Sequence, residues 1–132
     1  MAKRPLLFAV MCALVAVFVF SGVLSAEDEP FEKPMKMIGT AMKALKPAVI
    51  NGDMAVVKTN AETVATQIES IKNLEPPINK DKKAQLPVLA DKSIEVAKAL
   101  AAATDATTAK AKYADLGASC KACHTLFQPS ED

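Results

Sequence analysis

The pentapeptide Cys120-Lys121-Ala122-Cys123-His124 is the feature that most constrains this chain. Its spacing, C-x-x-C-H, is the attachment signature of a c-type haem. Residues three positions apart share one face of a helix, so Cys120 and Cys123 can both reach the vinyl groups on one edge of a porphyrin. His124 follows directly and can bind the iron as the proximal ligand. The motif therefore predicts one covalently attached haem c.

Two other kinds of site also contain a C-x-x-C pair: thioredoxin-like redox pairs and zinc sites. A structural zinc site needs four ligands. Outside the first 26 residues the chain has no cysteine or histidine besides Cys120, Cys123 and His124. A thioredoxin-like pair requires a βαβ context, and no strand pattern is present. The sequence therefore favours the haem over both alternatives.

Residues 1–26 have the features of a signal peptide. Lys3 and Arg4 form a positive start, an apolar run covers residues 6–20, and small residues precede Ala26. The alternative is a retained membrane anchor, for which an apolar run that ends at Phe20, or continues to Leu24, is of borderline length. We predict cleavage near Ala26 and a periplasmic location, because covalent haem attachment in bacteria takes place outside the cytoplasm.

Removal of this leader leaves one modest domain, residues 27–132. The full chain has a formal charge of +1, and loss of Lys3 and Arg4 leaves −1. This near-neutral net charge does not favour binding to nucleic acid. The sequence shows no glycine-rich phosphate loop, Ser/His/Asp set or paired-carboxylate motif. We therefore expect no enzyme activity, no nucleic-acid partner and no membrane attachment after cleavage.

Four amphipathic segments indicate helices. They cover residues 34–50, 53–74, 85–103 and 104–127. Asp53 suits the N-cap of the second helix, and Thr104 or Asp105 that of the fourth. Pro47 lies in the last turn of the first helix and predicts a bend or an early end near Lys46. The fold class predicted is all-α, an antiparallel four-helix bundle with covalently bound haem between its helices.

Two segments resemble the class II cytochromes c, a family that includes the cytochromes c′ and c-556. Residues 120–127, CKACHTLF, resemble its C-K-A-C-H-x-x-F ending, and residues 35–42, MKMIGTAM, are similar to the M-K-x-I-G-x-x-M start of the c-556 branch. Two positions depart from the family, which usually has arginine where this chain has Phe31 and Gln128. Lys33, Lys36 and Lys121 are substitutes for binding the haem propionates, and the sequence does not choose among them.

The sixth iron ligand decides the function. His124 is the sole histidine, so two histidines of one chain cannot both bind the iron. The domain has four methionines, and each is also an ordinary core residue. They are Met35, Met37, Met42 and Met54. The resemblance implies that Met35 is the distal ligand and that Met42, two turns further, packs against the haem, whereas Met37 lies on a different face.

With His124 and Met35 both bound, the iron is six-coordinate and low-spin, which predicts electron transfer. If Met35 only lines the distal side, the iron is five-coordinate and binds a small gas such as NO or CO, as the resemblance to cytochromes c′ implies. A third hypothesis is that the haem mainly holds the bundle together.

The sequence predicts a redox partner protein without naming it. The resemblance implies a homodimer through the first two helices. A small group of basic residues in the loop before the third helix is either a solvated surface or a site that steers an acidic redox partner. These residues are Lys80, Lys82 and Lys83.

Overall fold

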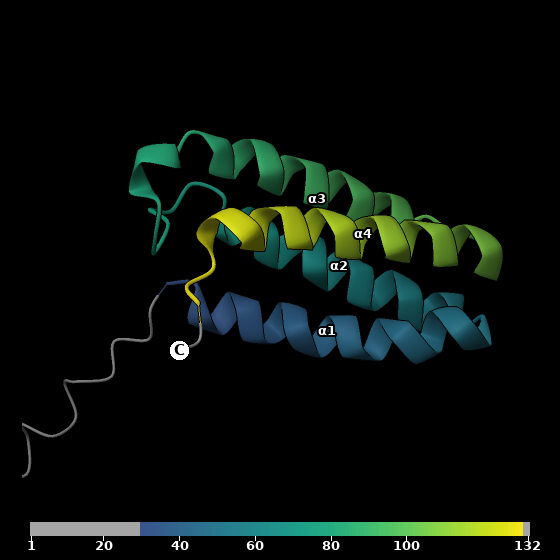
Figure 1. Ribbon diagram of the computed structural model, residues 1–132. Helices are drawn as coiled ribbons and strands as arrows, with labels where there is room; N and C mark the ends of the chain where they lie inside the picture. The colour runs from purple at the N-terminus through teal and green to yellow at the C-terminus, as the bar shows by residue number, and fades with distance from the viewer. Residues whose placement is uncertain (1–29, 131–132) are drawn as a thin grey trace, which may run out of the picture.

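The chain forms a bundle of four helices (Figure 1), seen here in a computed structural model that describes residues 30–130. Its elements are α1 (Glu32–Asn51), α2 (Met54–Ile71), the short 3-10 helix η1 (Lys80–Lys82), α3 (Gln85–Ala101) and α4 (Ala106–Phe127). No strand occurs in this part of the chain. The predicted all-α, four-helix architecture is confirmed, while the predicted leader and cleavage point lie outside the described residues.

Two of the helices begin at aspartate caps, as the sequence predicts. The carboxylate of Asp53 accepts a hydrogen bond from the backbone N–H of Val56 at 3.2 Å. Asp105 accepts one from the N–H of Thr108 at 2.8 Å and a second from the hydroxyl of Thr108 at 2.8 Å. These bonds satisfy N–H groups that have no partner within the helix. They also lower the pKa of the Asp105 carboxyl, since the charged form accepts them best.

The predicted early end of the first helix near Lys46 is wrong, while the alternative of a bend there stays a prediction. Helix α1 continues through Pro47 to Asn51. Proline leaves the carbonyl four residues earlier, that of Lys43, without its helical partner. Lys43 and Pro47 are both exposed, so water can replace the lost donor. The next two residues, Ala48 and Val49, are buried in the core, and their packing keeps the last turn helical.

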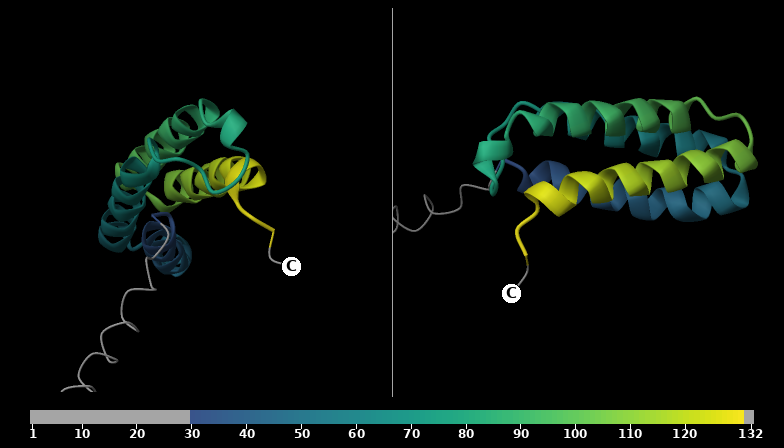
Figure 2. Two further views of the ribbon diagram at one scale, coloured as in Figure 1. Left: turned by 90° about the vertical axis from the view of Figure 1, so that its left-hand side faces the viewer. Right: turned by 45° about the horizontal axis from the view of Figure 1, so that its top comes forward.

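Consecutive helices are antiparallel neighbours, and α4 returns to lie beside α1 (Figure 2). Leucines and valines from all four helices fill the core between them. Those with almost no exposed surface are Leu45, Val49, Val57, Val64, Leu86, Leu100 and Leu116. Burying each such side chain contributes roughly 1.5–3 kcal/mol. No helix within residues 30–130 is long and apolar enough to cross a membrane.

Candidate haem site

A cavity of about 390 Å³ lies at the end of the bundle where α1 begins and α4 ends. Its size is within the range of about 300–1,000 Å³ that is usual for ligand and cofactor pockets. Most of its wall is apolar and comes from all four helices. The wall consists of Phe31, Met35, Ile38, Gly39, Met42, Ile68, Ile71, Pro77, Leu86, Ala90, Ser93, Cys120, Cys123, His124, Phe127, Gln128 and Pro129.

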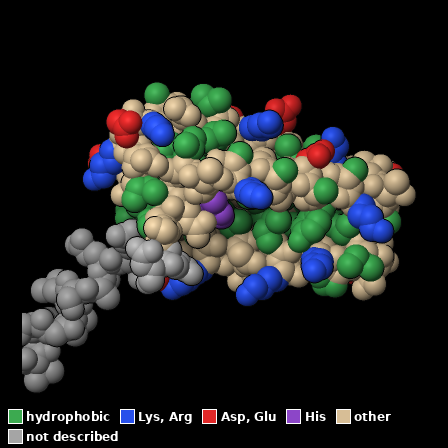
Figure 3. All heavy atoms as spheres, viewed as in Figure 1, with side chains coloured by type: hydrophobic (Ala, Val, Ile, Leu, Met, Phe, Trp, Pro, Cys, Tyr) green, Lys and Arg blue, Asp and Glu red, His purple; other side chains and the backbone are tan. Residues whose placement is uncertain are grey.

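All four residues that the sequence singles out line this one cavity. Cys120, Cys123 and His124 come from the last turns of α4, and Met35 comes from the first turn of α1. The two cysteines and Met35 are half-buried, whereas His124 is exposed at the rim, beside the hollow between α1 and α4 (Figure 3). The fold therefore brings together residues 85 or more positions apart in the chain. Their roles as attachment points and ligands stay predictions.

The chemistry of the two thiols argues against a redox-active pair. Burial raises the pKa of the Cys120 thiol, and the neighbouring Cys123 raises it further. Burial also raises the pKa of the Cys123 thiol. Catalytic C-x-x-C pairs have lowered thiol pKa values, because the thiolate is the nucleophile. Here both thiols stay protonated at neutral pH, which disfavours the thioredoxin-like alternative.

The donors that a zinc site requires do not converge in the described part of the chain. Among residues 30–130, no group of three or more His, Cys, Asp or Glu side chains is placed to hold a metal ion. The sequence contains no further histidine or cysteine to complete such a group beside Cys120, Cys123 and His124. The cavity is therefore better suited to a large apolar group than to a bare metal ion.

The buried polar groups at the cavity have partners of their own. Ser93 is 2% exposed, and its hydroxyl donates to the carbonyl of Leu89 at 3.2 Å. No buried side-chain nitrogen or oxygen within residues 30–130 lacks a hydrogen-bond partner. A polar ligand would find few groups to bind here, and burying it without hydrogen bonds is costly. The wall matches a ligand that is apolar over most of its surface, as a porphyrin is.

The structure leaves two of the four methionines as candidates for the distal ligand. Met35 and Met42 line the cavity. Met37 is 41% exposed and lies on another side of α1, as the sequence predicts. Met54 lies at the first turn of α2 and lines a separate, open groove.

The register of α1 against α4 separates the two remaining methionines. The hydroxyl of Tyr113 lies 3.5 Å from the carbonyl oxygen of Met42, which places these residues side by side on antiparallel helices. Seven residues back along α1 and seven forward along α4 bring Met35 opposite Cys120. Measured along α4, the level of Met35 is then four residues, or about 6 Å, from that of His124. The level of Met42 is eleven residues, or about 16 Å, from that of His124. Met35 is the better placed to face His124 across the cavity.

Sequence reasoning missed the part that Gly39 plays in the wall. Gly39 lines the cavity, and a Cβ atom added there would meet no other atom within 4 Å. Gly117, the glycine one turn before Cys120, is exposed and lines the open groove beside the cavity. The glycine in the segment MKMIGTAM was the available signal for Gly39, since a flat cofactor that approaches a helix closely needs a residue without a side chain.

The two positions where the sequence departs from the family both line the cavity. Phe31 adds an aromatic wall and Gln128 an amide where arginine is usual. No lysine or arginine lines the cavity itself. Lys121 lines an open groove that adjoins it and shares Met42, Cys120 and His124 with it. Of the three lysines proposed for the propionates, Lys121 is therefore the one that lies beside the cavity.

Asn79 ties the loop between α2 and α3 to the end of α4. Its side-chain amide donates to the carbonyl of Leu126, one of the last carbonyls of α4 that have no helical partner. Its backbone is left-handed, with φ 53°, and its carbonyl accepts from the N–H of Lys82 at 2.8 Å. The same loop carries Pro77, which lines the cavity. Asn79 thus holds one wall of the cavity against the turn that follows His124.

We expect Asn79→Ala to lower the free energy of unfolding by about 2 kcal/mol, because alanine loses the hydrogen bond and strains a left-handed residue. Asn79→Gly removes the bond but accepts the conformation, and should cost about 1 kcal/mol. Urea unfolding of the purified protein measures both. Equal stability of Asn79→Gly and the wild type would show that the bond to Leu126 contributes nothing.

No protein-family model and no curated protein matches the chain. Among solved structures, it is similar to the crystal structure of cytochrome c′ from Thermochromatium tepidum, with a TM-score of 0.62. The two share 24% sequence identity, and the match covers 77% of this chain and 98% of that one. A likeness at this level of identity shows the fold, and the chain therefore has the four-helix fold of that cytochrome c′.

Proposed function

We propose that the chain is a periplasmic c-type cytochrome that carries one haem c and transfers electrons. Cys120 and Cys123 attach the haem, His124 is the proximal ligand and Met35 the distal ligand. The observation that carries the proposal is the convergence of Met35, from one end of the described chain, and the C-x-x-C-H motif, from the other, on one apolar cavity. The cytochrome c′ fold of the bundle supports it.

The residues of the chain would act on the cofactor in distinct ways. A bound haem supplies a one-electron iron couple. His124 and Met35 would be its two protein ligands, and a histidine paired with a methionine raises the reduction potential of the iron. Apolar side chains such as Ile38, Leu86 and Phe127 would exclude water from the haem and stabilise its less charged, reduced state. Because the chain would supply both ligands, no position on the iron would be left for a substrate, and we expect no enzyme activity.

Gas binding is the second candidate, and the likeness to a cytochrome c′ favours it. In that case Met35 lines the distal side without binding the iron, which stays five-coordinate. Met35 is half-buried at the cavity wall, a position that suits either role. The two functions therefore differ in one bond, that between the Met35 sulfur and the iron.

An optical spectrum and a mass of the purified, exported protein test the proposal. Electron transfer predicts a mass increased by one covalently bound haem, a sharp low-spin α-band in the reduced state and a thioether-to-iron charge-transfer band in the oxidised state. Gas binding predicts a high-spin spectrum and rapid CO binding to the reduced protein. A colourless protein without added mass would overturn both.

Gly39→Leu should disturb the haem, because the new side chain enters the space beside the ring. Overpacking of this kind costs about 1–3 kcal/mol. We expect a smaller haem-loaded fraction and a weakened α-band. Gly117→Leu is the matched control, since it lies on the open groove, and should leave the absorption spectrum unchanged. Equal effects of the two substitutions would show that the ring does not lie against Gly39.

A further inference from the structure

The charges of the bundle are divided between its two halves. Helix α1 carries four lysines and one glutamate, and α4 carries three lysines and one aspartate. Helices α2 and α3 together carry three lysines and four carboxylates. The α1–α4 half thus has a formal charge of +5 and the α2–α3 half one of −1. The basic half is the one that contains His124 and the mouth of the cavity.

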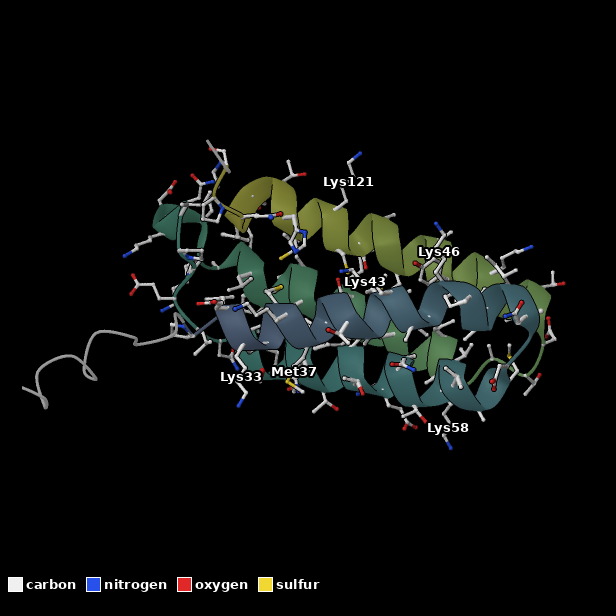
Figure 4. The ribbon with its side chains drawn as sticks, turned by 90° about the horizontal axis from the view of Figure 1, so that it is seen from below. Lys33, Met37, Lys43, Lys46, Lys58 and Lys121 are labelled. Carbon is white, nitrogen blue, oxygen red and sulfur yellow. The ribbon has the colours of Figure 1, made fainter. Side chains whose placement is uncertain are left out.

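Four exposed lysines of this half stand on the neighbouring helices α1 and α4, and we call them the basic strip. They are Lys43 and Lys46 on α1 and Lys110 and Lys121 on α4. Lys43 and Lys46 are three residues apart and project on the side of α1 that faces α4 (Figure 4). Lys110 and Lys121 are eleven residues apart, about three turns, and so share one side of α4.

The basic strip reaches the proposed haem site through Lys121. Lys121 lines the open groove that adjoins the cavity, together with Met42, Cys120 and His124. Lys43 follows Met42 in the chain. A partner that covers the strip would therefore cover the groove as well, and would approach the edge of a haem attached to Cys120.

Nothing in the described chain neutralises the strip. Within residues 30–130, no carboxylate lies within ion-pair distance of any of its four lysines, whereas Lys80 and Lys112 each have one such partner and Lys72 has two. The strip is also opposite in sign to the mature domain, whose predicted net charge is −1. A concentrated field of this kind steers oppositely charged molecules to the surface that carries it.

We propose that the basic strip is the docking surface for an acidic electron-transfer protein, which exchanges electrons through the groove beside Lys121. The proposal rests on the proposed function, since it needs a redox-active haem. It assigns the partner's place to the strip and not to the loop lysines Lys80, Lys82 and Lys83, which lie on η1 and just after it.

Oxidation of the reduced protein by hexacyanoferrate(III) tests the proposal. One electron passes from the ferrous haem to the reagent, which becomes hexacyanoferrate(II), and no proton moves. The wild-type rate should fall as salt is added, although the domain as a whole is predicted to be negative. With the cationic oxidant tris(phenanthroline)cobalt(III), the wild-type rate should instead rise as salt is added. Long polyglutamate, an acidic surface without a redox centre, should slow the reaction with hexacyanoferrate(III).

Two triple variants with the same change in net charge provide the comparison. Charge reversal in the strip, Lys43→Glu/Lys46→Glu/Lys121→Glu, should slow oxidation by hexacyanoferrate(III) about tenfold and abolish competition by polyglutamate. Charge reversal in the loop, Lys80→Glu/Lys82→Glu/Lys83→Glu, should change the rate less than about twofold, because salt screens charges distant from the site of reaction. Circular dichroism checks folding, and Lys→Gln versions at the strip replace any variant that fails to fold.

Equal slowing by the two triple variants, or a stronger effect of the loop variant, would overturn the docking surface and leave the proposed function intact. Polyglutamate competition that survives in the strip variant would do the same. A protein without a reducible haem would overturn the proposed function, and the docking surface with it.

Discussion

Met35→Ala is expected to convert the haem iron from low-spin to high-spin. The substitution removes the only methionine sulfur that the register of α1 and α4 places near the level of His124. The charge-transfer band of the oxidised wild type should disappear, and the α-band of the reduced protein should lose its sharpness. CO should then bind the reduced variant rapidly. In the wild type CO should bind more slowly, because the thioether of Met35 must first dissociate from the iron. Absorption spectra in both redox states and stopped-flow CO binding measure these effects.

Met42→Ala is the matched control for Met35→Ala. Met42 has the same chemistry, lines the same cavity and lies two turns along the same helix. Its loss should leave the charge-transfer band in place and lower only the stability, by roughly 2–4 kcal/mol if the site does not collapse. If Met42→Ala abolishes the band and Met35→Ala keeps it, the ligand is Met42. A wild type that is already high-spin would favour gas binding over electron transfer.

The fold was predictable because its signals are local. Helical spacing of apolar residues, the aspartates Asp53 and Asp105 and the turn at Gly52 each act within a few residues of a helix end. Pro47 shows where a local rule fails. A proline inside a helix costs about 3 kcal/mol. Burial of Ala48 and Val49 in the core offsets this cost. A rule that considers only the sequence of one helix cannot include that burial.

The candidate site was predictable only in part, because it depends on contacts between distant segments. C-x-x-C-H identifies its own chemistry wherever it lies. Met35 could be chosen from sequence only by resemblance, whereas the Tyr113–Met42 contact gives its level against His124. Gly39 has its role because the cavity lies beside it, and its sequence neighbours do not show this.

The basic strip could not be found from a run of sequence. The loop lysines stand together in the chain and attract notice, but Lys80 has an ion-pair partner in Glu75 at 3.9 Å. Lys46 and Lys110 are 64 positions apart in the chain and come to one face only through the pairing of α1 with α4. Surface charge is thus a property of the packing, and its pattern follows the helix pairs.

Removal of both attachment cysteines is expected to abolish the haem and most of the cooperative stability of the domain. In Cys120→Ser/Cys123→Ser, no thioether can form, and His124 alone is left to hold the iron. The empty cavity of about 390 Å³ would then have to be maintained without a filler. At about 24 cal/mol for each Å³ of cavity, that cost is about 9 kcal/mol if none of the space collapses or fills with water. The figure is an upper bound, because the cavity opens to solvent beside His124.

Even half of that cost is large against the 5–15 kcal/mol that typically holds a domain together. We therefore expect the double variant to keep helical far-UV circular dichroism, lose near-UV signals and bind a dye for exposed apolar surface. Its thermal transition should be broad, whereas that of the wild type should be sharp. Ala122→Ser, an exposed position between the two cysteines, is the control and should retain colour and a sharp transition. A colourless double variant that still melts as sharply as the wild type would mean that the four helices pack without the haem, and that the cavity closes by movement of α1 toward α4.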